Sequence, residues 1–266
     1  MAKDNLLWIF IHPIRTGGVT LFEFITKNVP KEEVFLASEA RYGFKDFQKF
    51  DPEKTRFALG HATYYGIHNL APKKKPRYFI FLRDPADRVV SYYNAKMQEI
   101  KNKIPFDEWY KKQMKNDLVN FLDLKYRGSE SSRINTPKFF MPLIKKLNYK
   151  SFYFLQTMTS HFLNFFGSNE KEKLENAKKL LDLCWFIRIL DNDEDKDFNF
   201  LINAMGLKDF KWEKKTGLTK NTFKITPKIR QMIYKDNALD YELYNYALEL
   251  RKKKIDRIKK ELIHNP

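Results

Sequence analysis

Uninterrupted runs of apolar residues mark the strands of a predicted sheet. Residues 6–11 are all apolar, and residues 77–82 continue from Arg77 into a similar run. Runs of this kind are typical of strands that are buried on both faces, as in a parallel sheet. Shorter apolar runs predict further strands at residues 34–36, 56–60 and 184–190.

Helical periodicity follows the two longest runs. Residues 20–27 have a helical pattern that closes before Pro30. After residues 77–82, Asp84 is a good N-cap and Pro85 suits the first helical position, so a helix is predicted from there to about residue 100. The apolar positions of this helix have helical spacing. They are Val89, Val90, Tyr93, Met97 and Ile100.

The rest of the chain is assigned more coarsely. A helix opens at residues 106–110, residues 126–138 form a long polar loop, and residues 211–224 are polar and basic. Further helices are predicted at residues 155–166 and 170–182, after the acidic residues 191–197 as far as Met205, and as one long helix from near Pro227. Because we find neither internal repeats nor a linker, we predict one α/β domain over residues 1–266, with three layers around a central parallel sheet.

Two adjacent glycines, Gly17 and Gly18, follow the first predicted strand. A strand, a glycine turn and a helix can aim backbone N–H groups and the positive end of a helix dipole at one anion. Arg15 and the hydroxyls of Thr16 and Thr20 add charge and donors, so we predict a phosphate or sulfate site. The alternative is an ordinary tight turn. No lysine follows Gly18 as a Walker loop requires, which disfavours an ATPase or GTPase.

Three more polar residues stand where catalytic groups gather in α/β proteins. His61 follows the strand at residues 56–60, and Arg83 stands at the tip of the strand at residues 77–82. Ser91 lies about two turns along the helix that follows. Taken singly, each has a plainer interpretation: a structural histidine, a surface ion-pair partner of a nearby aspartate, and a serine on a helix surface.

Composition narrows the class of partner. The 266 residues carry a formal net charge of +17, which favours anionic ligands such as nucleotides, sulfated or acidic polymers, nucleic acid or an anionic membrane surface. Lysine greatly outnumbers arginine, so sequence-specific DNA recognition is disfavoured. The alternative for many of these lysines is a solubilising surface.

Several other classes are disfavoured by what the sequence lacks. The single cysteine, Cys184, excludes an intramolecular disulfide and lies in an apolar run that suggests burial. The five histidines show no zinc-site spacing. We expect His12 and His68 to be structural, and the alternative for either is a second base. Neither a signal peptide nor an apolar stretch of membrane-spanning length is visible, so we expect a soluble, cytoplasmic protein.

Four stretches together carry a resemblance to a known family. They are residues 11–21 with the glycine turn, residues 59–61 with His61, residues 81–93 with Arg83 and Ser91, and residues 236–244 near the C-terminus. In these stretches the sequence resembles carbohydrate sulfotransferases of the Golgi type that use 3′-phosphoadenosine 5′-phosphosulfate (PAPS), close to the uronosyl 2-O-sulfotransferase branch and its soluble bacterial relatives. The third stretch is the most specific, because its arginine and serine keep their spacing.

The sequence departs from the family pattern within the first stretch. Pro13 comes one position early, Arg15 stands where lysine is expected, and Val19 replaces a hydroxyl residue. Residues 101–180 match only loosely. The change at Val19 removes one possible hydrogen-bond donor.

The resemblance implies a role for each candidate residue. Arg83 and Ser91 would hold the 3′-phosphate, and His61 would accept the proton of the acceptor hydroxyl. Arg15 would also serve catalysis by stabilising the leaving phosphate through charge and hydrogen bonds alone. The 5′-phosphosulfate would be bound by the turn, and a basic segment would fold over the nucleotide. These two sets are Arg15, Thr16, Gly17, Gly18, Val19 and Thr20, and Lys214, Lys215 and Lys220.

The sequence thus predicts a PAPS-dependent O-sulfotransferase whose acceptor is a carbohydrate or another hydroxyl compound. Sulfuryl transfer rests on positioning and electrostatics, and it requires no metal. Two alternatives stay open: a nucleotide-dependent kinase of the P-loop type, and an inactive basic module that binds anionic glycans or nucleic acid. We expect the acceptor to be chosen by loops at residues 38–55 and 126–138, and the oligomeric state is left open.

Overall fold

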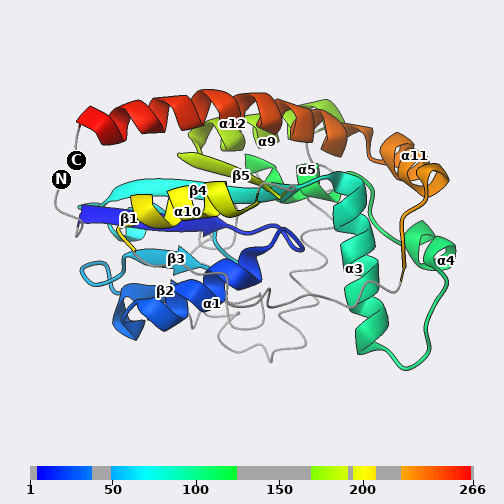
Figure 1. The fold of residues 1–266 in the computed structure, drawn as a ribbon, viewed down its shortest axis with the longest axis horizontal. Helices are drawn as coiled ribbons and strands as arrows, with labels where there is room; N and C mark the ends of the chain where they lie inside the picture. Colours follow the sequence, from blue (N-terminus) through cyan, green and yellow to red (C-terminus); the bar gives the residue numbers. More distant parts are fainter. Residues whose placement is uncertain (1–4, 38–48, 125–168, 191–193, 208–222, 265–266) are drawn as a thin grey trace, which may run out of the picture.

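The computed structural model describes residues 5–37, 49–124, 169–190, 194–207 and 223–264 (Figure 1). Its central sheet has five described strands, all parallel, in the order β2-β3-β1-β4-β5. The strands are β1 (Leu6–Ile11), β2 (Val34–Leu36), β3 (Phe57–Leu59), β4 (Lys75–Arg83) and β5 (Phe186–Leu190). Every strand that the apolar runs predicted is confirmed, to within two residues at either end.

Helices cover both faces of this sheet, which gives three layers (Figure 1). One face packs on α5 (Asp117–Leu122), α9 (Glu170–Leu183) and α12 (Ala238–His264). The other face packs on α1 (Gly18–Asn28) and α10 (Glu194–Ala204). Alternate residues of β1 enter the two cores, because successive side chains of a strand point to opposite faces. The predicted α/β fold with a central parallel sheet is confirmed.

A third group of helices stands beyond the carboxyl ends of the strands. It contains α3 (Pro85–Glu99), α4 (Phe106–Lys111) and α11 (Pro227–Asp236), which share an aromatic core. In Figure 1 the strand arrows point toward α3. Two short 3-10 helices, Lys31–Glu33 and Ile67–Leu70, complete the described elements. This group closes the edge of the sheet where β1, β3 and β4 end.

Two predicted elements are corrected by the structure. The single helix predicted from Pro227 is two helices, because Asn237 leaves the helical conformation and its side chain bonds Tyr110 Oη and the carbonyl of Ile233, both at 2.9 Å. The acidic run 191–197 does not precede a helix, because α10 begins inside it at Glu194. The loop at 126–138 and the helix at 155–166 lie outside the described residues.

Among the described residues, no helix combines the length and the apolar character that crossing a membrane demands.

Candidate functional site

The turn between β1 and α1 is held in a compact conformation with two left-handed residues. Arg15 has φ 67° and Gly17, the N-cap of α1, has φ 81°. Thr16 is fully buried, and its hydroxyl donates to the carbonyl of Pro13 at 2.8 Å. Left-handed residues in such a turn gather backbone N–H groups into an anion-binding concavity. Because the N-cap is glycine, no cap side chain occupies the first N–H groups of α1.

The two glycines of this turn are required for different reasons. A Cβ atom at Gly17 would lie 2.9 Å from Leu190 Cδ1, and φ 81° strains any other residue there. A Cβ atom at Gly18 would lie 2.1 Å from His12 Nε2. The turn is therefore packed between β5 on one side and the His12 ring on the other.

Arg15 connects the turn to helix α3. Its Nε donates to Ser91 Oγ at 3.1 Å, although 76 residues separate them in the sequence. Ser91 is buried, which corrects its plainer interpretation as part of a helix surface. Burial and the nearby charge of Arg83 both lower the pKa of the Arg15 guanidinium. The structure thus brings together Arg15, predicted to bind the 5′-phosphosulfate of PAPS, and Ser91, predicted to bind its 3′-phosphate.

Helix α3 is fixed at its N-terminal end, before Ser91, by ion pairs with Arg230 of α11. Asp84, the N-cap, accepts from the backbone of Ala86 and Asp87 and pairs with Arg230 Nη1 at 2.9 Å. Arg230 also contacts Asp87. Asp84 and Asp87 are the aspartates nearest to Arg83 in the sequence, and both contact Arg230.

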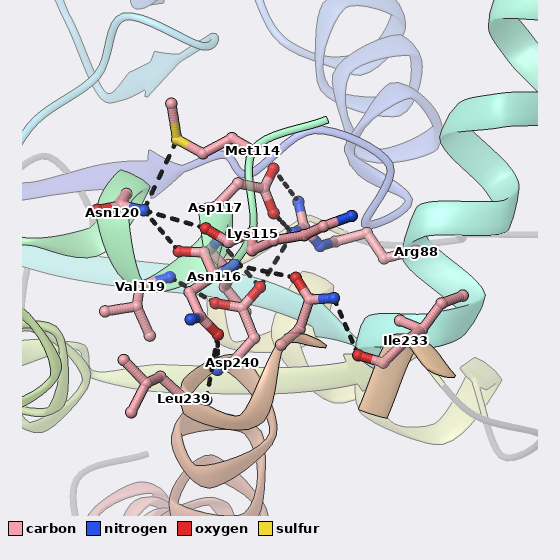
Figure 2. Close-up of polar contacts among 12 residues, drawn as sticks. Arg88, Met114, Lys115, Asn116, Asp117, Val119, Asn120, Ile233, Leu239 and Asp240 are labelled. Carbon is pink, nitrogen blue, oxygen red and sulfur yellow. Dashed lines mark hydrogen bonds and ion pairs between the residues drawn. The ribbon is translucent and has the colours of Figure 1, made fainter. Parts of the chain in front are cut away.

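A buried network anchors the same helix to the opposite end of the chain (Figure 2). Arg88, one turn before Ser91, pairs with Asp117 and lies 3.4 Å from Asp240 Oδ2. Asp240 also accepts from the backbone N–H groups of Leu118 at 3.2 Å and Val119 at 2.9 Å. Burial raises the pKa of Asp240 to about 6. The network ties α3, α5 and α12 together behind the predicted phosphate site.

His61 reaches the same edge of the sheet from β3. Gly60 precedes it with φ 119°, and a Cβ atom there would lie 2.1 Å from the carbonyl oxygen of Ala37. His61 Nδ1 lies 3.2 Å from the carbonyl oxygen of His12. Because a carbonyl only accepts, Nδ1 carries the proton, and the lone pair of the neutral ring is on Nε2. This is the tautomer that a general base requires when its Nε2 faces the acceptor.

His12, which the sequence predicted to be structural with a second base as the alternative, contacts two of the predicted site residues. Its ring is buried, stacks on His61 with centroids 4.1 Å apart, and stacks on Phe10 at 4.7 Å. The same ring fills the space beside Gly18. Its place directly after β1 was visible in the sequence, but its contact with His61 was not. His12 therefore joins the predicted base to the glycine turn.

The lysines predicted to cover the nucleotide, Lys214, Lys215 and Lys220, lie outside the described residues. The chain is described again from Phe223, whose backbone exchanges two hydrogen bonds with Asn94: Phe223 N to Asn94 Oδ1 at 3.0 Å and Asn94 Nδ2 to Phe223 O at 3.2 Å. Asn94 lies on α3 three residues after Ser91. The C-terminal side of the basic segment is therefore attached to the helix that carries Ser91.

The remaining candidates have structural surroundings. Cys184 is buried, and burial raises the pKa of its thiol to about 12. His68 Nδ1 lies 2.6 Å from Tyr78 Oη, and burial lowers the pKa of His68. Within the part of the chain that the structure describes, no three histidine, cysteine or acidic side chains are grouped as a metal site needs.

Comparisons with known proteins give a family. The chain is similar to a mouse sulfotransferase, SULT7A1, solved in complex with PAP, at 14% identity over 92% of this chain and 90% of that one, with a TM-score of 0.34. No curated protein matches the chain by sequence. The model of the sulfotransferase family matches residues 45–247, which include His61, Arg83 and Ser91 but not the glycine turn. Because that match spans more than half of the chain, the protein belongs to the sulfotransferase family.

Proposed function

We propose that this protein transfers a sulfuryl group from PAPS to a hydroxyl group of an acceptor, in the first place a carbohydrate. Family membership supports sulfuryl transfer. The observation that carries the choice of donor is the hydrogen bond of 3.1 Å between Arg15 and Ser91. This bond holds the glycine turn next to Ser91 on α3. PAPS carries a phosphosulfate on the 5′ position of its ribose and a phosphate on the 3′ position, so its two charged groups match this pair of neighbouring sites.

The donor would be held by two groups of residues. The backbone of the glycine turn, with Thr20 at the start of α1, would bind the 5′-phosphosulfate. Arg83 and Ser91 would bind the 3′-phosphate. Arg15 contacts Ser91, so we place its guanidinium between the two phosphates, where it attracts both instead of serving the leaving group alone. Val19 would contribute only its N–H group, because its apolar side chain is exposed.

His61 would take the proton of the attacking hydroxyl. The acceptor oxygen forms a bond to sulfur while the bond from sulfur to the 5′-phosphate oxygen breaks. The electron pair of that bond stays on the 5′-phosphate of the product, 3′-phosphoadenosine 5′-phosphate (PAP). The acceptor proton moves to His61 Nε2. The His12 carbonyl holds the opposite nitrogen of the ring at 3.2 Å and stabilises the imidazolium that forms. A positioned base of this kind contributes about 10²–10⁴-fold to the rate.

The charge of the chain supports an anionic acceptor. A formal net charge of +17 raises the local concentration of acidic glycans and speeds their association. A carbohydrate that already carries carboxylate or sulfate groups fits this field better than a neutral one. The proposed acceptor class is therefore an acidic glycan.

The proposal is tested by transfer of radiolabelled sulfate from PAPS to a panel of neutral and acidic glycans. His61→Gln is expected to lower kcat by about 100-fold or more while PAP binding stays within about twofold. His68→Gln is the matched control, because His68 contacts Tyr78 instead of His12 and should keep wild-type turnover.

Other outcomes would overturn the proposal in different ways. Stabilisation of the protein by ATP with magnesium, without response to PAP, would indicate a kinase. Binding of a heparin-like polymer without any transfer would indicate an inactive binding module. A fully active His61→Gln variant would leave sulfuryl transfer standing and refute the assigned base.

A further inference from the structure

Arg188 is a buried cation among aromatic side chains on one face of the sheet. It lies on β5 with 1% of its surface exposed, between Phe186 and Leu190 on the same face. Its guanidinium carbon stands 5.0 Å from the ring centroid of Phe81 on β4 and 5.2 Å from that of Phe198 on α10. A guanidinium is costly to bury, and an aliphatic residue would fill this place at less cost.

The guanidinium is directed toward the glycine turn. A Cβ atom on Gly17 would lie 3.7 Å from Arg188 Nη1 and 2.9 Å from Leu190 Cδ1. Both side chains therefore support the turn from the side that faces β5. Leu190 is also the partner of Arg83 in the sheet register. Arg188 is therefore on the protein side of the same turn whose N–H groups face the proposed phosphosulfate.

Arg188 adds a positive charge to a corner of the molecule that already carries several. Arg15, Arg83 and the N-terminus of α1 already concentrate positive charge at this corner, and a further buried cation there adds to their repulsion. An anion bound on the turn relieves that repulsion. Because Arg188 is buried, its attraction for such an anion is weakly screened by solvent.

We propose that Arg188 is a positioning residue of the donor site, which supports the left-handed turn at Gly17 and strengthens anion binding on the opposite side of that turn through its buried charge. The identity of the anion as the phosphosulfate of PAPS rests on the proposed function. The support of the turn and the added charge do not, because any phosphate or sulfate on the turn would be affected.

The test compares two substitutions of Arg188 with a matched arginine elsewhere. Arg188→Met removes the charge and keeps the length of the side chain, and Arg188→Lys keeps the charge. Arg77→Met is the control, because Arg77 also stands over an aromatic ring, Trp185, at 5.0 Å but lies in the first half of β4. Dissociation constants for PAP and for pyrophosphate are measured by calorimetry, with the melting temperature of each unliganded variant.

The expected result is a selective loss of anion affinity. Arg188→Met should raise the Kd of PAP by about tenfold or more, which corresponds to about 1.4 kcal/mol. Arg188→Lys should stay within about threefold of wild type, and Arg77→Met within about twofold. In the transfer assay the KM for PAPS should rise more than kcat falls, because the reacting atoms are not touched.

Three results would overturn this inference. The first is a Kd of the Met variant within twofold of wild type. The second is equal weakening by Met and Lys together with a lower melting temperature, which would show a structural role only. The third is a tenfold loss of PAP affinity in an Arg188→Lys variant whose melting temperature is normal. This result decides the question even where the Met variant does not fold. A wild type that binds pyrophosphate but not PAP would refute the donor and leave the Arg188 comparison valid, and one that binds neither would refute both.

Discussion

At the scale of single residues, the site depends on side chains that no spacing rule brings together. Arg15 and Ser91 are 76 positions apart yet bonded, and His12 stacks on His61 across two strands. Arg15 lies within the glycine turn, Ser91 contacts the turn through Arg15, and His12 contacts it at Gly18. His61 is connected to the turn through His12. The turn, the proposed base and the proposed phosphate sites are therefore mechanically coupled through a few contacts.

Gly18→Ala tests that coupling directly. The added Cβ atom would lie 2.1 Å from His12 Nε2, so the His12 ring must move, and His61 stacks on that ring. We expect kcat to fall by about 10-fold or more, because misplacement of a base by an ångström is costly. The measurement is steady-state sulfate transfer at saturating PAPS, well below the melting temperature.

The control for this variant is Gly206→Ala. Gly206 has φ 72°, so alanine there is strained by about 1–2 kcal/mol, but it follows α10 and is not part of the proposed site. This variant should melt earlier and keep wild-type turnover. A Gly18→Ala enzyme with normal kcat would show that His12 does not position His61.

Sequence reasoning found some of these residues and not others. The glycine turn, Arg83 and Ser91 were identified because their residue types and order form motifs. His12 was visible as the residue after a strand, but whether it touches His61 depends on the pairing of β1 with β3. Arg188 was hidden inside an apolar run, because nothing local distinguishes a buried arginine from an exposed one.

At the scale of elements, helix α3 shows which features a local pattern predicts and which it does not. Its N-cap, its first residue and its end were predicted to within one residue, because capping is a local property. Its second buried face was not. Arg88, Ser91 and Asn94 follow one another at helical spacing and are buried. They contact α5, the glycine turn and Phe223 respectively, which no local pattern reveals.

The network around Asp240 predicts how stability depends on pH. Burial raises the folded-state pKa of Asp240 to about 6, above that of an unfolded aspartate, so the folded state binds more protons between these values. The free energy of unfolding of wild type minus that of Asp240→Asn should therefore fall as pH rises from about 4 to about 6, by at most about 1.4 kcal/mol per pH unit. Urea unfolding at several pH values measures it.

Asp236→Asn provides the comparison for this experiment. Asp236 ends α11, is 37% exposed and lies 3.9 Å from Lys115 Nζ, so its contact is a weak surface pair. Its substitution should shift stability by well under 1 kcal/mol. A stability difference for Asp240→Asn that rises with pH over the same interval would show that the ion pair with Arg88 outweighs burial.

At the scale of the whole molecule, the order of the strands explains why the candidate site residues meet. β1 lies between β3 and β4, so the residues that follow these three parallel strands meet at one edge of the sheet. They are His61, the glycine turn and Arg83. The apolar runs predicted parallel strands, but the order β2-β3-β1-β4-β5 depends on long-range pairing that no single run specifies.

The central claim is that one PAPS molecule is bound through two groups: its 5′-phosphosulfate at the glycine turn, and its 3′-phosphate at the corner between β4 and α3. Calorimetry with PAP and with adenosine 5′-phosphate measures this most directly, because the two ligands differ only in the 3′-phosphate. Wild type should bind PAP at least about tenfold more tightly, and Ser91→Ala should remove most of that difference while leaving the affinity for adenosine 5′-phosphate unchanged. Equal affinities for both ligands in wild type, or a preference that survives in both Ser91→Ala and Arg83→Ala, would contradict the account.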